Sequence, residues 1–117
     1  TPVTDAASVN RCIQAVRRVF VHRAVKDYLV AIVAGTRDSA DIRLGASPRA
    51  SLQLMRAAKA RAAVDGRNYV TPDDVQALAL PTLAHRVMLS HEARMGRRSV
   101  AEVVSQVVAA VPLPQRR

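Results

Sequence analysis

The chain has 117 residues, a length that suits one domain with a single hydrophobic core. Half of the residues are hydrophobic but only 3% are aromatic, so the core must be built from Ala, Val and Leu in closely packed helices. No apolar run approaches the length of a membrane span, and a lone Cys12 excludes an internal disulfide. Residues 1–10 lack a signal-peptide pattern, so we expect a cytoplasmic protein.

The charge is strongly positive, with 18 Lys and Arg against 9 Asp and Glu and a formal net charge of +9. Such a balance suggests nucleic acid, a phosphate ligand or an acidic protein surface as the partner. Arginines that simply decorate solvated helix faces would give the same charge, and their even spread along the chain fits this second interpretation equally well.

The N-terminal third predicts two helices. Residues 1–7 are expected to be a tail, and residues 8–19 show the i, i+3, i+4, i+7 apolar spacing of an amphipathic helix. Cys12 lies on the apolar face of this helix and is predicted to be a buried small hydrophobe. After a short extended step at Phe20 and Val21, residues 23–36 predict a second helix. Its buried stripe is expected to contain Val25, Tyr28, Leu29, Ile32 and Val33, with His22 as a cap or surface group near its start.

A polar connection over residues 37–44 leads into Gly-Ala-Ser-Pro-Arg-Ala at residues 45–50, which opens an Ala-rich third helix over residues 48–65. Ser47 is expected to be the N-cap and Pro48 the first helical residue. Arg49 follows in the first turn, where the helix dipole disfavours a cation, so a bound anion nearby would stabilise it.

Other cations of the third helix are predicted to be less specific. Arg56 shares a face with Arg49 but lies seven residues further on, roughly 10 Å away, so only one of the two can meet a given phosphate. The position at the helix start is the stronger candidate. Lys59, Arg61 and Arg67 are expected to be solvated.

The fourth helix has a complete start signal. Thr71 is the predicted N-cap and Pro72 the first helical residue, and the carboxylates of Asp73 and Asp74 suit the first turn. This capping role explains both carboxylates without a metal ion. Residues 68–70 form a second extended step that could pair with Phe20 and Val21, and Pro81 is predicted to end or kink the helix. A further short helical turn is expected over residues 81–87.

The last helix is predicted over residues 99–110, with Ser99 and Glu102 as a capping box and residues 115–117 as a tail. His85, His91 and Glu92 do not share a face with metal-ligand spacing, so no metal site is predicted. The expected fold is therefore all-α, a small bundle of about five helices with one pair of very short strands.

Three pieces together resemble the C-terminal lid of the MoxR-type AAA+ ATPases: residues 45–50, Gly-Arg-Asn-Tyr-Val-Thr-Pro-Asp-Asp-Val at residues 66–75, and the pair His85-Arg86. The similarity extends over roughly residues 19–114. The resemblance implies that Arg49, supported by Gly45, Ser47 and Pro48, is the sensor-2 arginine, which in this family reaches the γ-phosphate of ATP.

The resemblance also implies the surroundings of the chain. ATP and Mg2+ are expected in the full-length protein and no cofactor in this fragment. The partners would be the protein's own P-loop core, neighbouring subunits of a ring, expected to be a hexamer, and proteins with von Willebrand factor A domains. His85 and Arg86 match a recurrent pair of the family and are secondary candidates, although polar contacts at a helix end would explain them as well.

The chain lacks a Gly-x-x-x-x-Gly-Lys-[Ser/Thr] loop and any nucleophile–base constellation, so it is not expected to be a complete enzyme. Residues 1–117 are interpreted as one lid domain without its ATPase core, which would couple hydrolysis to chaperone-like remodelling. The alternative is a stand-alone basic helical module that binds nucleic acid, with short extended steps as in histone-like folds. The Ser-Pro-Arg helix start favours the lid, because a nucleic-acid module does not need it.

Overall fold

The computed structural model describes residues 3–114, and the tail predicted at residues 115–117 lies outside this part, as do residues 1–2. Within it the chain forms six α-helices, a 3-10 helix η1 and a two-stranded antiparallel sheet, which confirms the predicted mostly helical class. The elements in chain order are α1 (Ala6–Arg17), α2 (Arg23–Asp38), β1 (Ile42–Leu44), α3 (Arg49–Val64), α4 (Pro72–Leu83), η1 (Ala84–Arg86), β2 (Met88–Leu89), α5 (His91–Met95) and α6 (Val100–Ala110). No helix in residues 3–114 is long and apolar enough to cross a membrane.

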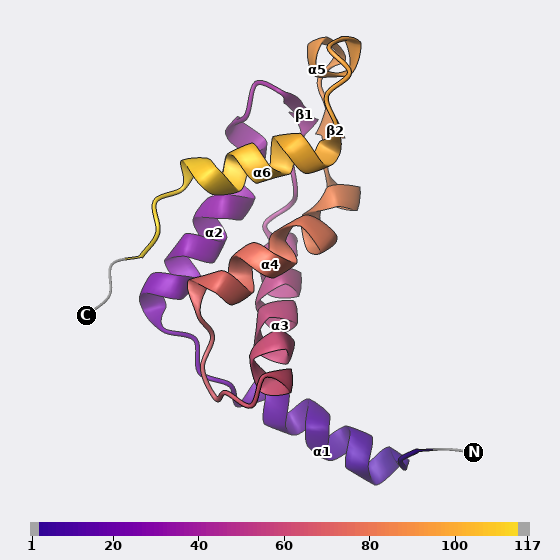
Figure 1. Cartoon of the computed structure of the whole chain (residues 1–117), viewed down its shortest axis with the longest axis vertical. Coiled ribbons are helices and arrows are strands. Elements are labelled where there is room, and N and C mark those ends of the chain that lie inside the picture. The colour runs from indigo at the N-terminus through magenta and orange to yellow at the C-terminus, as the bar shows by residue number, and fades with distance from the viewer. Residues whose placement is uncertain (1–2, 115–117) are drawn as a thin grey trace.

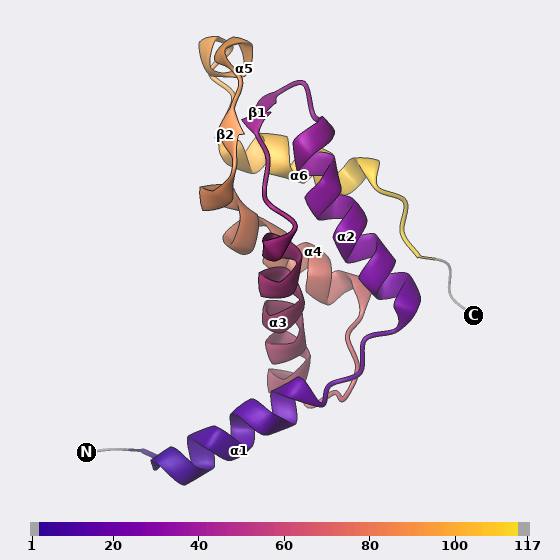
Figure 2. The ribbon, with the colours of Figure 1, turned by 180° about the vertical axis from the view of Figure 1, so that it is seen from behind.

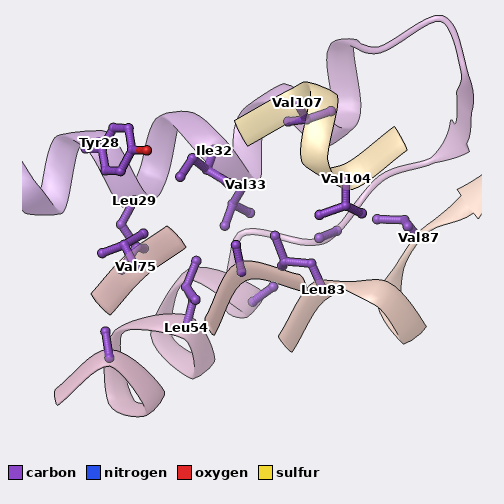
Figure 3. Close-up of a cluster of buried hydrophobic side chains, with 14 of the residues drawn as sticks. Tyr28, Leu29, Ile32, Val33, Leu54, Val75, Leu83, Val87, Val104 and Val107 are labelled. Carbon is purple, nitrogen blue, oxygen red and sulfur yellow. The ribbon is translucent and has the colours of Figure 1, made fainter. Parts of the chain in front are cut away.

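The core lies between α2, α3, α4 and α6 (Figures 1 and 3). The predicted stripe of α2 is buried in full, and the three inward valines of α6 lie against it. Tyr28 is only 3% exposed, which confirms its predicted place in the buried stripe, and its hydroxyl accepts a hydrogen bond from Gln76 Nε2 at 3.1 Å. His22 caps α2, since its Nδ1 accepts from the N–H of Ala24 at 3.1 Å.

Helix α1 departs from expectation, because none of its residues is buried. It projects away from the helices of the core in both views (Figures 1 and 2), and Val9 and Ile13 on its apolar face are 45% and 46% exposed. The prediction that Cys12 is buried is therefore wrong. Apolar spacing shows that a helix has an apolar face, but not that another element of the same chain covers it. The projection also explains a radius of gyration of 16.0 Å, against about 13 Å for a compact chain of this length.

The exposure of Cys12 has a direct chemical consequence. In the isolated native chain, we expect a thiol-specific reagent such as Ellman's reagent to modify one thiol as fast as it does in denaturant, because the sulfur is accessible without unfolding. A Cys12→Ser variant is the control and should not react. Modification only after denaturant is added would contradict the exposed position of α1.

Two pairs of short extended segments connect distant parts of the chain. The predicted pairing of the two extended steps is confirmed as a parallel bridge between Phe20 and Tyr69, in which the N–H of Phe20 donates to the carbonyl of Asn68 at 2.8 Å. The sequence did not predict the second pair, β1 with β2, because residues 37–44 read as a polar connection. The partners are Ile42 with Leu89 and Leu44 with Met88, with a register irregularity between them.

The chain between α4 and α6 contains the short helical turn predicted over residues 81–87, which is η1, and one further helix that was not predicted. Pro81 does not end α4, which continues to the fully buried Leu83. Pro81 is exposed and lies two residues before the end of α4, so its missing N–H removes only one intrahelical hydrogen bond, the one to the carbonyl of Ala77. The short α5 was not predicted, although Ser90 caps it by accepting from the N–H of Ala93 at 3.2 Å.

The start of α4 carries a network of charged hydrogen bonds. Thr71 and Asp74 make the predicted capping box, but Asp74 is 0% exposed and also accepts from two arginines. Arg67 Nη2 lies 2.7 Å from Asp74 Oδ1, and Arg61 donates to the same oxygen. The prediction that Arg61 and Arg67 are simply solvated is therefore wrong. Lys59 also has a partner, because its Nζ donates to the carbonyl of Arg17 at 3.2 Å.

Electrostatics keep Asp74 ionised. Burial by itself would raise the pKa of this carboxyl group, but hydrogen bonds from Arg67, from the backbone N–H of Thr71 and from Arg61 outweigh it and hold the pKa well below its usual range. The same contact raises the pKa of Arg67 further above its ordinary value. The network therefore joins the end of α3 to the start of α4 through a permanently charged cluster.

Candidate functional site

Arg49 is the first residue of α3, and its side chain is exposed. Among residues 3–114, the salt bridges of the structure involve other arginines, and none involves Arg49. The guanidinium is thus available for a ligand or a partner. Its position at the positive end of a 16-residue helix is unfavourable for a cation unless an anion is nearby.

The expected cap of α3 is wrong by one residue. Pro48, with φ −55° and ψ −27°, is the N-cap, and no side chain caps the helix. The Ser47 carbonyl accepts from the N–H of Ala50 at 2.9 Å, so a tight backbone turn replaces the expected hydroxyl contact. Pro48 can take this place because its locked φ suits the αR turn. The amino end of α3 therefore has no side-chain oxygen over it, which leaves it open beside Arg49.

The segment before Arg49 is held against the end of α2. The hydroxyl of Thr36 accepts from the N–H of Ala46 at 2.9 Å and donates to the carbonyl of Val33 at 2.6 Å. Arg37 Nη1 donates to the carbonyl of Ala46 at 3.0 Å. A Cβ on Gly45 would lie 2.6 Å from the carbonyl carbon and oxygen of Thr36, so only glycine allows this approach. These contacts fix the path of the chain into α3.

The sequence analysis did not include Thr36 or Arg37 in the site, although the apolar pattern of α2 contains a signal for Thr36. Thr36 continues the buried stripe of α2, because it follows Ile32 by four residues and Val33 by three. A polar residue on an apolar stripe needs a partner inside the protein. The sequence does not show that this partner is the N–H of Ala46, ten residues further on.

The pair His85-Arg86 lies in η1, and both side chains are exposed. Arg86 Nε donates to the carbonyl of Thr82 at 3.0 Å, a contact within the end of α4 and the turn that follows. Among residues 3–114, no hydrogen bond joins His85 or Arg86 to Arg49. Between residues 3 and 114, no group of three or more His, Cys, Asp or Glu is arranged to hold a metal ion.

Comparison with known proteins assigns this arrangement to a class. Residues 34–107 match the family described as AAA lid domain, so the chain belongs to that family. It is 39% identical over 105 residues to the chaperone MoxR1 of Mycobacterium tuberculosis, covering 82% of this chain and 28% of that protein. These findings confirm the predicted membership among the lids of MoxR-family AAA+ ATPases.

Two further proteins are similar to this chain over most of its length. An uncharacterised protein, YeaC of Bacillus subtilis, is 42% identical over 102 residues, covering 87% of this chain and 32% of that protein. A crystal structure of a candidate ATPase from Cytophaga hutchinsonii superimposes with a TM-score of 0.80 at 27% identity, covering 87% of this chain and 34% of the other. The chain thus spans about a third of the length of these relatives.

Proposed function

We propose that this chain is the lid that supplies Arg49, as the sensor-2 arginine, to ATP bound by a P-loop core. The observation that supports this proposal most is the exposed guanidinium without an ion-pair partner at the uncapped amino end of α3. Gly45, Ser47 and Pro48 would support it by shaping the chain just before the helix. His85 and Arg86 are secondary candidates, since they are exposed at the end of the helix that packs along α3.

The chemistry of Arg49 fits a terminal phosphate. A guanidinium is permanently charged and offers a planar fork of donors, which can bond two phosphate oxygens at once. The open helix end adds a fixed positive potential at the same place. The described residues do not fit Mg2+, since they include no cluster of carboxylates, so the proposed core would have to hold that ion with the phosphates.

A contact between the lid and the γ-phosphate would also couple chemistry to motion. The contact is present with a triphosphate and lost with a diphosphate, so the two nucleotides favour different positions of the lid. This coupling is the proposed source of chaperone-like remodelling in the full-length protein. The name of the chaperone MoxR1 supports this role.

The remaining features of the full-length protein follow as proposals from the same family. Residues 1–117 would form one lid unit, joined in the cytoplasm to a P-loop core that binds ATP and Mg2+. The core and lid would assemble into a ring, proposed to be a hexamer, and act with proteins that contain von Willebrand factor A domains. The AAA lid domain match supports assembly with a core in an oligomer.

The isolated chain itself should bind ATP only weakly and should not hydrolyse it. One charge-assisted contact contributes about 1.5–3 kcal/mol, whereas a micromolar dissociation constant requires about 8 kcal/mol. Calorimetry of the isolated chain with Mg2+ and ATP is the measurement, and we expect no saturable binding below millimolar nucleotide. A low-micromolar dissociation constant would contradict the proposal that the core binds the nucleotide and the lid contributes only Arg49.

A further inference from the structure

We infer that Thr36 and Arg37 are positioning residues for Arg49, acting through the backbone N–H and the backbone carbonyl of Ala46. This inference rests on the proposed function of Arg49. Thr36, Arg37, Gly45 and Ala46 together form a lid clamp. The clamp joins the end of α2 to the segment that enters α3, three residues before Arg49.

The hydroxyl of Thr36 carries the first half of the clamp. Its proton is donated to the carbonyl of Val33 and its lone pair accepts from the N–H of Ala46, so both functions of the hydroxyl are used. Thr36 and Ala46 are both 0% exposed, so water does not offer an alternative partner for that N–H. A valine would have nearly the same shape as Thr36 but could make neither hydrogen bond.

Arg37 carries the second half. Its guanidinium bonds the carbonyl of Ala46, so two consecutive residues of α2 hold the two polar groups of one residue in the following segment. Gly45 makes this possible because its missing Cβ lets the segment lie directly against the backbone of Thr36 and Arg37. The clamp therefore requires both the hydrogen-bonding groups of Thr36 and Arg37 and the absence of a side chain at Gly45.

The clamp fixes where α3 begins relative to the core. Helix α2 is anchored by Ile32 and Val33, which are 0% and 1% exposed, so the end of α2 is a rigid reference point. A charge that stabilises a developing phosphoryl transition state must be held in place before the reaction, and an error of about 1 Å can cost roughly a hundredfold in rate. Loosening the clamp would leave the core packed but would let the first turn of α3 shift.

The test uses the full-length ATPase and the matched variants Thr36→Val and Thr36→Ser. Thr36→Val should lower kcat by roughly ten- to a hundredfold with little change in KM for ATP. Thr36→Ser retains the hydroxyl and should stay within about threefold of wild type. Arg37→Gln, a substitution at an exposed side chain, is the second probe and should lower kcat by several-fold even if Thr36→Val fails to fold.

A double-mutant cycle with Arg49→Ala separates positioning from general damage. If the clamp acts through Arg49, Thr36→Val should cause no further loss of kcat once Arg49 is alanine. Additive losses, or wild-type kcat in both Thr36→Val and Arg37→Gln while Arg49→Ala is impaired, would overturn the inference and leave the role of Arg49 intact. Wild-type kcat in Arg49→Ala would instead overturn the proposed function, and this inference with it.

Discussion

Replacing Arg49 with alanine should lower the ATP turnover of the full-length protein by roughly ten- to a thousandfold, the usual effect of losing one preorganised charge stabiliser. The lid itself should stay folded, because the side chain is exposed and is not part of the core. Steady-state ATPase rates are the measurement, with the melting temperature of the isolated chain as the check on folding.

Two further substitutions test the chemistry of that position. Arg49→Lys should rescue poorly, because a point charge does not reproduce the planar fork of a guanidinium. Arg56→Ala is the matched control, since Arg56 lies two turns further along the same face of α3, where it lines the apolar groove of about 710 Å³ between α1 and α3. Its turnover should remain close to wild type. A wild-type rate in Arg49→Ala would contradict the proposed sensor role, and residues 45–50 would then be only the start of a helix.

Replacing Asp74 with alanine should destabilise the isolated chain by about 3 kcal/mol, near the lower end of the range for breaking a buried ion pair. The loss lies at the lower end of this range because the side chain of Arg61 is 44% exposed and can turn into water, whereas that of Arg67 is only 19% exposed. The melting temperature should fall by roughly 10 °C. Asp73→Ala is the matched control, because Asp73 is exposed and contributes only its favourable interaction with the helix dipole, about 0.3–1 kcal/mol.

The same network predicts how stability changes with pH. The pKa of Asp74 is lowered in the folded chain, so the unfolded chain takes up its proton first as the solution is acidified. The contribution is therefore complete above the unfolded pKa of about 3.9 and is lost as pH falls below it. Urea unfolding between pH 6 and pH 2 should show wild-type stability falling toward that of Asp74→Asn. A gap between the two proteins that stays constant over this range would contradict the assignment.

What the sequence could predict is mostly local. The stripe of α2 and the Thr71 cap of α4 depend on residues within a few positions of each other, and both are confirmed. Arg49 could be placed at a helix start for the same reason. The cap at Ser47 was wrong by one residue because two signals, a serine and a proline, compete for the same turn.

What the sequence could not predict depends on the tertiary structure. The capping role of Asp74 was predicted correctly, but its hydrogen bond from Arg61 was not, because Arg61 lies thirteen residues away on another helix. The β1 strand has its partner in β2, more than forty residues further along the chain. The lid clamp depends on a hydrogen bond between Thr36 and Ala46, which lie ten residues apart. The segment between them shows no apolar periodicity from which this contact could be predicted. The burial of Cys12 was predicted wrongly because amphipathic spacing does not show whether another part of the chain packs against the apolar face of a helix.

The most direct test of the central claim is a structure of the full-length protein with Mg2+ and a non-hydrolysable ATP analogue. We expect the guanidinium of Arg49 to donate to a terminal-phosphate oxygen at about 2.7–2.9 Å, with Ala46 still bonded to Thr36 and Arg37. A terminal phosphate bound without Arg49, or by another lid residue in its place, would contradict the proposed function.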